Sequence, residues 1–100
     1  MHPIDGQELL VRIQKGEKLH LVDVREEIEY HTYNIGGQNI PLSKFYENIQ
    51  QLGYNKTDEI IVICKVGLRS QTACNILIEN GYLQSRNLRG GLLSLQKLKQ

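Results

Sequence analysis

The stretch Ile60-Ile61-Val62-Ile63-Cys64-Lys65-Val66-Gly67-Leu68-Arg69-Ser70 decides the fold. Its first residues, 60–63, are continuously apolar and β-branched, which is typical of a strand that is covered on both faces of a parallel sheet. Residues 65–68 leave room only for a tight loop, and from Arg69 onward apolar residues repeat at helical spacing as far as Asn80-Gly81. Strand, tight loop and helix in this order predict one unit of an α/β protein.

The residues before this stretch predict a similar alternation. Asp5 is a good N-cap for a short helix that stops at Gly16. A nearly continuous apolar segment over residues 19–24 predicts a second buried strand. A short acidic helical segment at 26–30 leads into residues 36–41, whose glycines and proline predict a loop with room for a brief strand.

Two further helices and a last strand are expected around the central unit. Ser43 can cap a helix that carries Phe45, Ile49 and Leu52 and ends at Gly53. Toward the end of the chain, Leu88 lies in an expected short strand, and Gly90-Gly91 separates it from a helix with Leu92, Leu95 and Leu98. Strands that alternate with helices predict a parallel sheet between helices, within a single domain over residues 1–100 that is monomeric by default.

Composition narrows the class of function. The chain has 100 residues, 40% hydrophobic and 23% charged, as in ordinary soluble domains. A net charge of +1 without a basic block argues against nucleic acid as a partner. No apolar run approaches the roughly 20 residues that cross a bilayer, and a secretory signal is not recognised, so we expect no membrane span and a cytoplasmic location. The two cysteines, Cys64 and Cys74, are then expected to be reduced thiols.

Cys64 stands where an α/β protein usually places its ligands, at the carboxyl end of a buried strand. Backbone amides of residues 65–70 have no strand partners and can point at the sulfur, together with the positive end of the following helix. Lys65 and Arg69 add positive charge, and Gly67 can adopt the backbone angles that a tight cradle requires. These features predict a reactive, partly exposed thiolate, whereas the plainer alternative is a small buried residue that ends a strand.

The loop Cys64-Lys65-Val66-Gly67-Leu68-Arg69-Ser70 resembles the active-site loop of rhodanese-like sulfurtransferases. Three further stretches resemble segments of this family in the same order. Residues 21–25 resemble its strand with an Asp-x-Arg turn, residues 40–42 the loop that follows, and residues 87–91 the last strand with its diglycine. The resemblance extends over residues 4–97 and implies a three-layer fold with a central parallel sheet of about five short strands. Two departures leave the subfamily open: residues 33–37 replace a Gly-His-Ile type turn, and Leu95 stands where a tryptophan often follows.

The resemblance implies a reaction in two steps. The Cys64 thiolate takes a sulfane sulfur from thiosulfate or another persulfide and passes it to cyanide, a thiol or a sulfur-carrier protein. A ring of amide donors in the loop suits the anionic persulfide, so neither a metal nor an organic cofactor is expected. Asp23 and Arg25 are expected to brace the loops, and Arg69 either binds the sulfonate of a donor or pins the loop through its carbonyls.

Two alternatives stay open. Cysteine phosphatases and arsenate reductases also set a cysteine and an arginine around an anion, but with one residue more than the four between Cys64 and Arg69. Rhodanese-like domains also serve as non-catalytic docking or regulatory modules, although the retained Cys64 argues against that role. Cys74, in the following helix, is expected to pack in the core, and the scattered histidines show no metal-ligand spacing.

Overall fold

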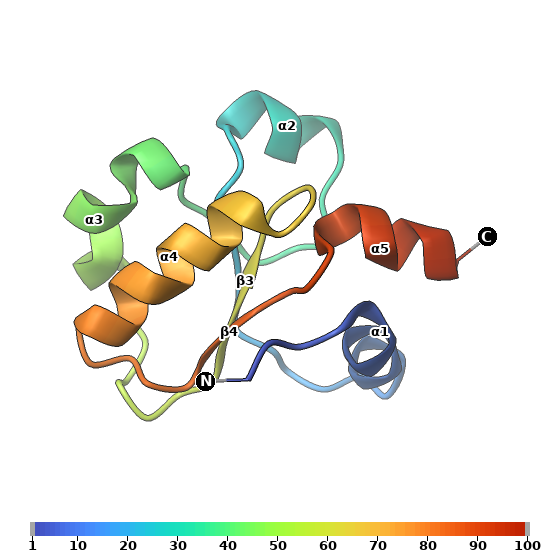
Figure 1. Cartoon of the computed structure of the whole chain (residues 1–100), viewed down its shortest axis with the longest axis horizontal. Coiled ribbons are helices and arrows are strands. Elements are labelled where there is room, and N and C mark those ends of the chain that lie inside the picture. Colours follow the sequence, from blue (N-terminus) through green and yellow to red (C-terminus); the bar gives the residue numbers. More distant parts are fainter. Residues whose placement is uncertain (1, 100) are drawn as a thin grey trace.

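The structure is a computed structural model that describes residues 2–99, and these residues form a parallel sheet of four strands between helices (Figure 1). The strand order is β2-β1-β3-β4. The strands are β1 (Leu21–Asp23), β2 (Gln38–Asn39), β3 (Ile60–Ile63) and β4 (Ser85–Asn87). In the register of the sheet Asp23 lies opposite Ile63, and Val62 lies opposite Asn87. The carboxyl ends of three neighbouring strands therefore meet at one edge.

Helices cover both faces of the sheet, which confirms the expected three-layer α/β fold. The helices are α1 (Gly6–Gln14), α2 (Glu27–Thr32), α3 (Phe45–Asn48), α4 (Leu68–Glu79) and α5 (Gly91–Leu98). In Figure 1, α1 and α5 lie together on one side of the sheet and α3 and α4 on the other. The short helix α2 lies near the edge where the strands end.

The central strand β3 divides its side chains between two cores. Ile60 and Val62 belong to the core under α3 and α4, whereas Ile61 and Ile63 belong to the core under α1 and α5. This alternation follows from the period of a strand, in which successive side chains point to opposite faces. Cys64 continues the series and lies in the α4 core. All of these side chains are at most 1% exposed, as the continuous apolarity predicted.

Local signals in the sequence place the first helix correctly. The carboxylate of Asp5 accepts a hydrogen bond of 2.8 Å from the backbone N–H of Glu8, as an N-cap does at the start of a helix. Similarly, Gly53 ends the 43–52 region with a φ of 73°, in the left-handed region.

The prediction of one continuous helix from Ser43 to Leu52 is wrong. This region consists of a 3₁₀ turn η1 (Leu42–Lys44), the short α3 and a second 3₁₀ turn η2 (Ile49–Leu52), and Ser43 lies inside η1 without capping a helix. The side-chain amide of Asn48 donates to the carbonyl of Lys44 at 2.7 Å. A side chain that competes in this way for a backbone acceptor disturbs the regular helix.

Strand ends also differ from expectation. β1 is shorter than the predicted 19–24 segment, and β4 stops at Asn87, one residue before Leu88. Leu88 instead forms an isolated parallel bridge with Ile4, next to the four strands of the described part of the chain. Within residues 2–99, no helix has the length and apolarity needed to cross a membrane.

A candidate active site at Cys64

Cys64 follows β3 and begins the tight loop that leads into α4. Gly67, the N-cap of α4, has a φ of 97°, which L side chains rarely adopt. A Cβ at this position would also lie 3.2 Å from the backbone nitrogen of Gly90. The loop therefore needs glycine here both for its turn and for its close packing against the residues that follow β4.

The loop directs hydrogen-bond donors at the Cys64 sulfur. The backbone N–H groups of Gly67 and Ser70 point at Sγ, with N···S distances of 3.1 Å and 3.3 Å, and the Ser70 hydroxyl oxygen lies at 3.2 Å. Burial alone raises the pKa of the Cys64 thiol. The hydrogen bonds from Ser70 and from the loop amides outweigh burial, so the pKa lies below that of an ordinary cysteine. The site therefore favours a thiolate, the nucleophilic form.

Cys64 is only 1% exposed, so the prediction of a partly exposed thiol is wrong. The sulfur turns inward toward Ser70 and packs in the same core as Val62 and Ala73. Attack on a donor needs direct contact with the sulfur atom. A reaction at Cys64 therefore requires the cysteine side chain or its loop to move outward.

Asn87 extends the network around the sulfur and was missed in the sequence. It lies at the end of β4, where its side-chain oxygen accepts a hydrogen bond from the Ser70 hydroxyl. Its amide nitrogen donates to the carbonyl of Gly67 at 3.1 Å. The signal was present, because Asn87 begins the Asn-Leu-Arg-Gly-Gly motif, but its contact with Ser70 depends on the register of β3 and β4.

Arg69 pairs with Glu29 of α2, and not with the loop carbonyls that were one of its two expected partners. Its terminal nitrogens contact the two carboxylate oxygens of Glu29 at 2.6 Å and 3.0 Å. Hydrogen bonding to Arg69 lowers the pKa of Glu29 to about 2, so this carboxylate stays charged. The sequence offered no sign of the pairing, since 40 residues separate the partners.

Asp23 and Arg25 form a buried ion pair at the end of β1. Asp23 is 0% exposed and Arg25 6%. The Arg25 Nη2 group donates to Asp23 at 2.8 Å and to the carbonyl of Tyr33 at 2.6 Å, which ties β1 to the residue after α2. The pair therefore braces two loops, as the sequence predicted. Among the hydrogen bonds of residues 2–99, neither side chain donates to the Cys64 sulfur.

The loop also packs against the start of α5. The backbone N–H of Leu92 donates to the carbonyl of Cys64 at 2.9 Å, and that of Leu93 donates to the carbonyl of Lys65 at 3.0 Å. Gly91 has a φ of 63°, and a Cβ there would lie 2.3 Å from the Lys65 carbonyl oxygen. The second glycine pair thus lies beside the loop that follows Cys64, as expected.

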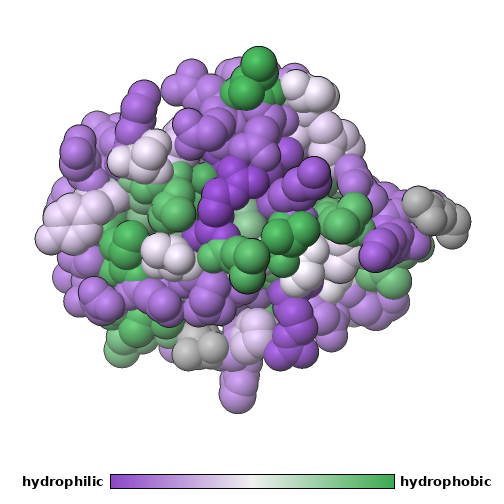
Figure 2. Space-filling model, turned by 45° about the horizontal axis from the view of Figure 1, so that its top comes forward, coloured by the Kyte–Doolittle hydropathy of each residue, from purple (hydrophilic) through white to green (hydrophobic). Residues whose placement is uncertain are grey.

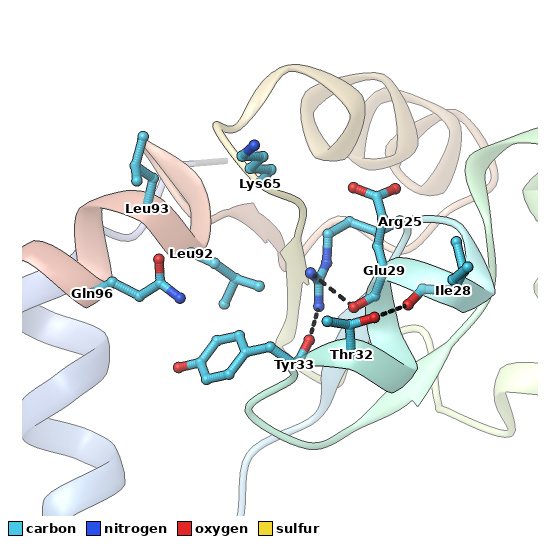
Figure 3. A pocket seen from close by; sticks show the side chains of 9 residues that line it. All are labelled: Arg25, Ile28, Glu29, Thr32, Tyr33, Lys65, Leu92, Leu93 and Gln96. Atoms are coloured by element: carbon cyan, nitrogen blue, oxygen red, sulfur yellow. Dashed lines mark hydrogen bonds between the residues drawn. The ribbon is translucent and has the colours of Figure 1, made fainter.

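A groove of about 340 Å³ opens next to the loop (Figure 3). Residues of α5 line one side and residues of α2 line the other. Its lining consists of Arg25, Ile28, Glu29, Thr32, Tyr33, Lys65, Leu92, Leu93 and Gln96. Of the remaining loop residues, Val66 is 44% exposed and Leu68 76%, so both are free to contact a bound molecule.

The second thiol differs from the first. Cys74 is 2% exposed within α4, and burial raises its pKa to about 12. It therefore stays protonated and packs in the core, as predicted. Among residues 2–99, no group of three or more His, Cys, Asp or Glu side chains is placed to hold a metal ion.

Comparisons with known proteins identify the family and several relatives of this chain. The family model described as the rhodanese-like domain matches residues 6–98. A sulfurtransferase of Allochromatium vinosum is 30% identical over 94% of this chain and 87% of its own length. The thiosulfate sulfurtransferase PspE of Escherichia coli is 36% identical over 80% of this chain and 79% of its own.

Solved structures have the same architecture. A rhodanese-like domain protein from Staphylococcus aureus is 26% identical, with a TM-score of 0.84 over 95% of this chain and 91% of that one. The human single-domain sulfurtransferase TSTD1 is 25% identical, with a TM-score of 0.81 over 98% and 96%. Other relatives are longer: this chain spans 43% of one from Bacillus subtilis and 25% of one from Mycobacterium tuberculosis.

Proposed function

The chain belongs to the rhodanese-like domain family, and on this premise we propose that it is a sulfurtransferase that carries sulfane sulfur as a persulfide on Cys64. The observation that carries the proposal is the convergence of the Gly67 and Ser70 amides and the Ser70 hydroxyl on the Cys64 sulfur. These donors stabilise a thiolate before the reaction. The same kind of donor stabilises the anionic terminal sulfur after it.

In the first step the Cys64 thiolate attacks the outer sulfur of the donor. With thiosulfate, a Cys64–S bond forms, the S–S bond of thiosulfate breaks, and sulfite leaves with the bonding electron pair. With an organic persulfide, the corresponding leaving group is a thiolate. Since the nucleophile is already favoured as an anion, no general base is needed to remove a proton during this step.

In the second step an acceptor nucleophile attacks the terminal sulfur of the Cys64 persulfide. The new bond forms to the acceptor, and the Cys64 thiolate is regenerated with the electron pair of the broken S–S bond. Cyanide is a convenient acceptor for assays and yields thiocyanate. In the cell, we propose that the acceptor is a thiol or a sulfur-carrier protein. Relatives named as sulfurtransferases support the reaction type.

Intact mass measures the first step directly. The purified protein and a Cys64→Ala variant are incubated with thiosulfate or with a persulfide donor, then with cyanide. We expect the mass of one sulfur atom on the wild-type protein alone, and its release as thiocyanate. A Cys74→Ala variant is the matched control, because the second thiol is buried and protonated, and it should still take up sulfur.

The burial of Cys64 favours one competing function, a docking module without catalysis. If the sulfur never becomes accessible, the same fold can still present its loop to a partner. Absence of sulfur uptake from thiosulfate and from a persulfide, in folded protein, would refute the proposed transfer and leave the docking function as the better explanation.

A further inference from the structure

A salt bridge joins the start of α4 to the wall of the neighbouring groove. Glu29 lines the groove, and its carboxylate points from α2 toward the start of α4, where Arg69 lies (Figure 3). Both carboxylate oxygens accept hydrogen bonds from the terminal nitrogens of Arg69, at 2.6 Å and 3.0 Å. Two-point pairing of this kind is also how a guanidinium binds other oxyanions. Glu29 therefore occupies donors that an anionic substrate would use.

Arg69 lies near the reacting sulfur. It precedes Ser70, whose backbone N–H points at the Cys64 Sγ with an N···S distance of 3.3 Å. Hydrogen bonding to Glu29 raises the pKa of Arg69, and the charge of the Cys64 thiolate raises it further, so the guanidinium stays charged. A donor that presents its outer sulfur to Cys64 brings its sulfonate into the same region.

The cations that line the groove do not offer the same contact. Arg25 is 6% exposed, and its guanidinium bonds Asp23. Lys65 makes no ion pair within residues 2–99, but its ammonium is a point charge without the planar fork of a guanidinium. A sulfonate that needs a two-point contact therefore competes with Glu29 for Arg69.

The salt bridge is open to such competition. The side chains of Arg69 and Glu29 are 36% and 32% exposed. Figure 2, which turns the top of Figure 1 toward the viewer, shows hydrophilic side chains open to solvent beside hydrophobic ones on the face that carries α2. Ion pairs that water reaches are weak, so a ligand can exchange with one of the partners.

We propose that Glu29 sets the donor specificity of the site by withholding Arg69 from donors that carry a charged sulfonate. The inference rests on the proposed function and adds a residue of α2 that touches no reacting atom. A thiosulfate dianion must displace the Glu29 carboxylate before Arg69 can bind it. A donor without charge at that end has less to gain from Arg69, so it is held back less. Glu29 is thus a positioning residue that acts through Arg69.

Glu29→Gln tests this inference, because the amide keeps the size of the side chain and loses its charge. Glutamine also preserves the helix cap, in which the Glu29 side chain accepts the backbone N–H of Glu26 at 3.1 Å. The two donors are thiosulfate and methanethiosulfonate, in which a methyl group replaces one charged oxygen. With either donor Cys64 attacks the outer sulfur, a Cys64–S bond forms, the S–S bond breaks, and sulfite or methanesulfinate leaves with the electron pair.

The ratio of kcat/KM for the two donors, with cyanide as the acceptor, isolates the effect of the sulfonate charge. A change in the nucleophilicity of Cys64 affects both donors and cancels in the ratio. We expect Glu29→Gln to raise kcat/KM about tenfold for thiosulfate, since the released guanidinium gains hydrogen bonds to a charged group. For methanethiosulfonate we expect about threefold, since hydrogen bonds to uncharged oxygens are about half as strong. In an Arg69→Gln background the change in the ratio should disappear, because no guanidinium is released.

Glu27→Gln is the matched control, and it should leave the ratio unchanged. Glu27 also lies in α2 and is exposed, but it does not line the groove and forms no salt bridge within residues 2–99. A second variant, Glu29→Asp, keeps the charge on a shorter side chain and weakens the two-point contact. It should shift the ratio in the same direction as Glu29→Gln by a smaller factor, which keeps the test decisive if Glu29→Gln does not fold.

The outcomes separate this inference from the function on which it rests. An unchanged ratio in Glu29→Gln, the same change in the Arg69→Gln background, or the same change in Glu27→Gln would overturn the inference alone. If folded wild-type protein takes up sulfur from neither donor and from no persulfide, the proposed function is wrong, and the inference fails with it.

Discussion

The side-chain hydroxyl of Ser70 lies 3.2 Å from the sulfur of Cys64, in the first turn of α4. The same hydroxyl also contacts the side-chain oxygen of Asn87. Ser70 has a single hydroxyl proton to share between these acceptors. When Cys64 is a thiolate, its full charge makes it the stronger acceptor, so the Ser70 hydroxyl is placed to stabilise the thiolate in exchange for its hydrogen bond to Asn87.

Removal of this hydroxyl should make Cys64 a weaker nucleophile at neutral pH. We expect Ser70→Ala to slow alkylation of Cys64 by iodoacetamide at pH 7 about tenfold, because a hydrogen bond to a charged group is lost while the backbone N–H donors remain. Ser43→Ala, which removes a hydroxyl outside the site, is the control. Equal rates in Ser70→Ala and wild type would show that the hydroxyl does not stabilise the thiolate.

The two cysteines should separate in a pH titration. The pKa of Cys64 is lowered and that of Cys74 is raised to about 12, so the thiolate of Cys64 forms first as the pH rises. We expect alkylation of folded protein to label Cys64 alone, with a rate that reaches half its maximum below the ordinary cysteine value of about 8.5. Peptide mapping after labelling identifies the site. A midpoint above that value, or labelling of Cys74 first, would contradict the assignment.

A methyl group at Gly91 should disturb the loop that follows Cys64. Gly91→Ala places a Cβ 2.3 Å from the Lys65 carbonyl oxygen at a φ of 63°, so it adds a clash with backbone to an unfavourable conformation. We expect a loss of at least about 2 kcal/mol in urea unfolding. Gly16→Ala is the control, because Gly16 also has a positive φ, of 75°, but no neighbour within 4 Å of the added atom. Equal losses of unfolding free energy in the two variants would mean that the close packing of Gly91 on the loop does not contribute to stability.

The parts of the fold that local sequence determines were predictable. The apolar run of β3, the tight turn at Gly67 and the periodicity of α4 act over a few residues each, and together they placed Cys64 at the carboxyl end of a central strand. The break between α3 and η2 was not predictable from periodicity. It accompanies a side-chain contact of Asn48 with a backbone carbonyl, which competes with the helix.

The parts of the site that depend on tertiary packing were not predictable. Residue spacing predicted the hydrogen-bond donors around Cys64. It did not predict that the sulfur turns inward and is buried. The contact of Asn87 with Ser70 needs the register between β3 and β4, and the pairing of Arg69 with Glu29 needs α2 to pack against the loop. Such long-range contacts have no periodic signature in a single sequence.

The buried pair of Asp23 and Arg25 should be a major source of stability at this edge of the sheet. In Asp23→Asn the side chain keeps its size but loses its charge, and the Arg25 guanidinium, 6% exposed, is left without a carboxylate. Removal of one partner from a buried ion pair costs about 3–5 kcal/mol, because the other charge stays desolvated. We expect a loss of that size in the free energy of unfolding by urea.

The matched control for Asp23→Asn is Glu17→Gln. Glu17 also pairs with an arginine, Arg12, at 3.2 Å, but its side chain is 41% exposed. Water and salt screen such a surface pair, so we expect a loss below about 1 kcal/mol. A similarly small loss in both variants would mean that the partners that remain to Arg25 are sufficient without Asp23, first among them the Tyr33 carbonyl at 2.6 Å from its Nη2. The brace would then depend on the backbone of the segment after α2 rather than on the buried carboxylate.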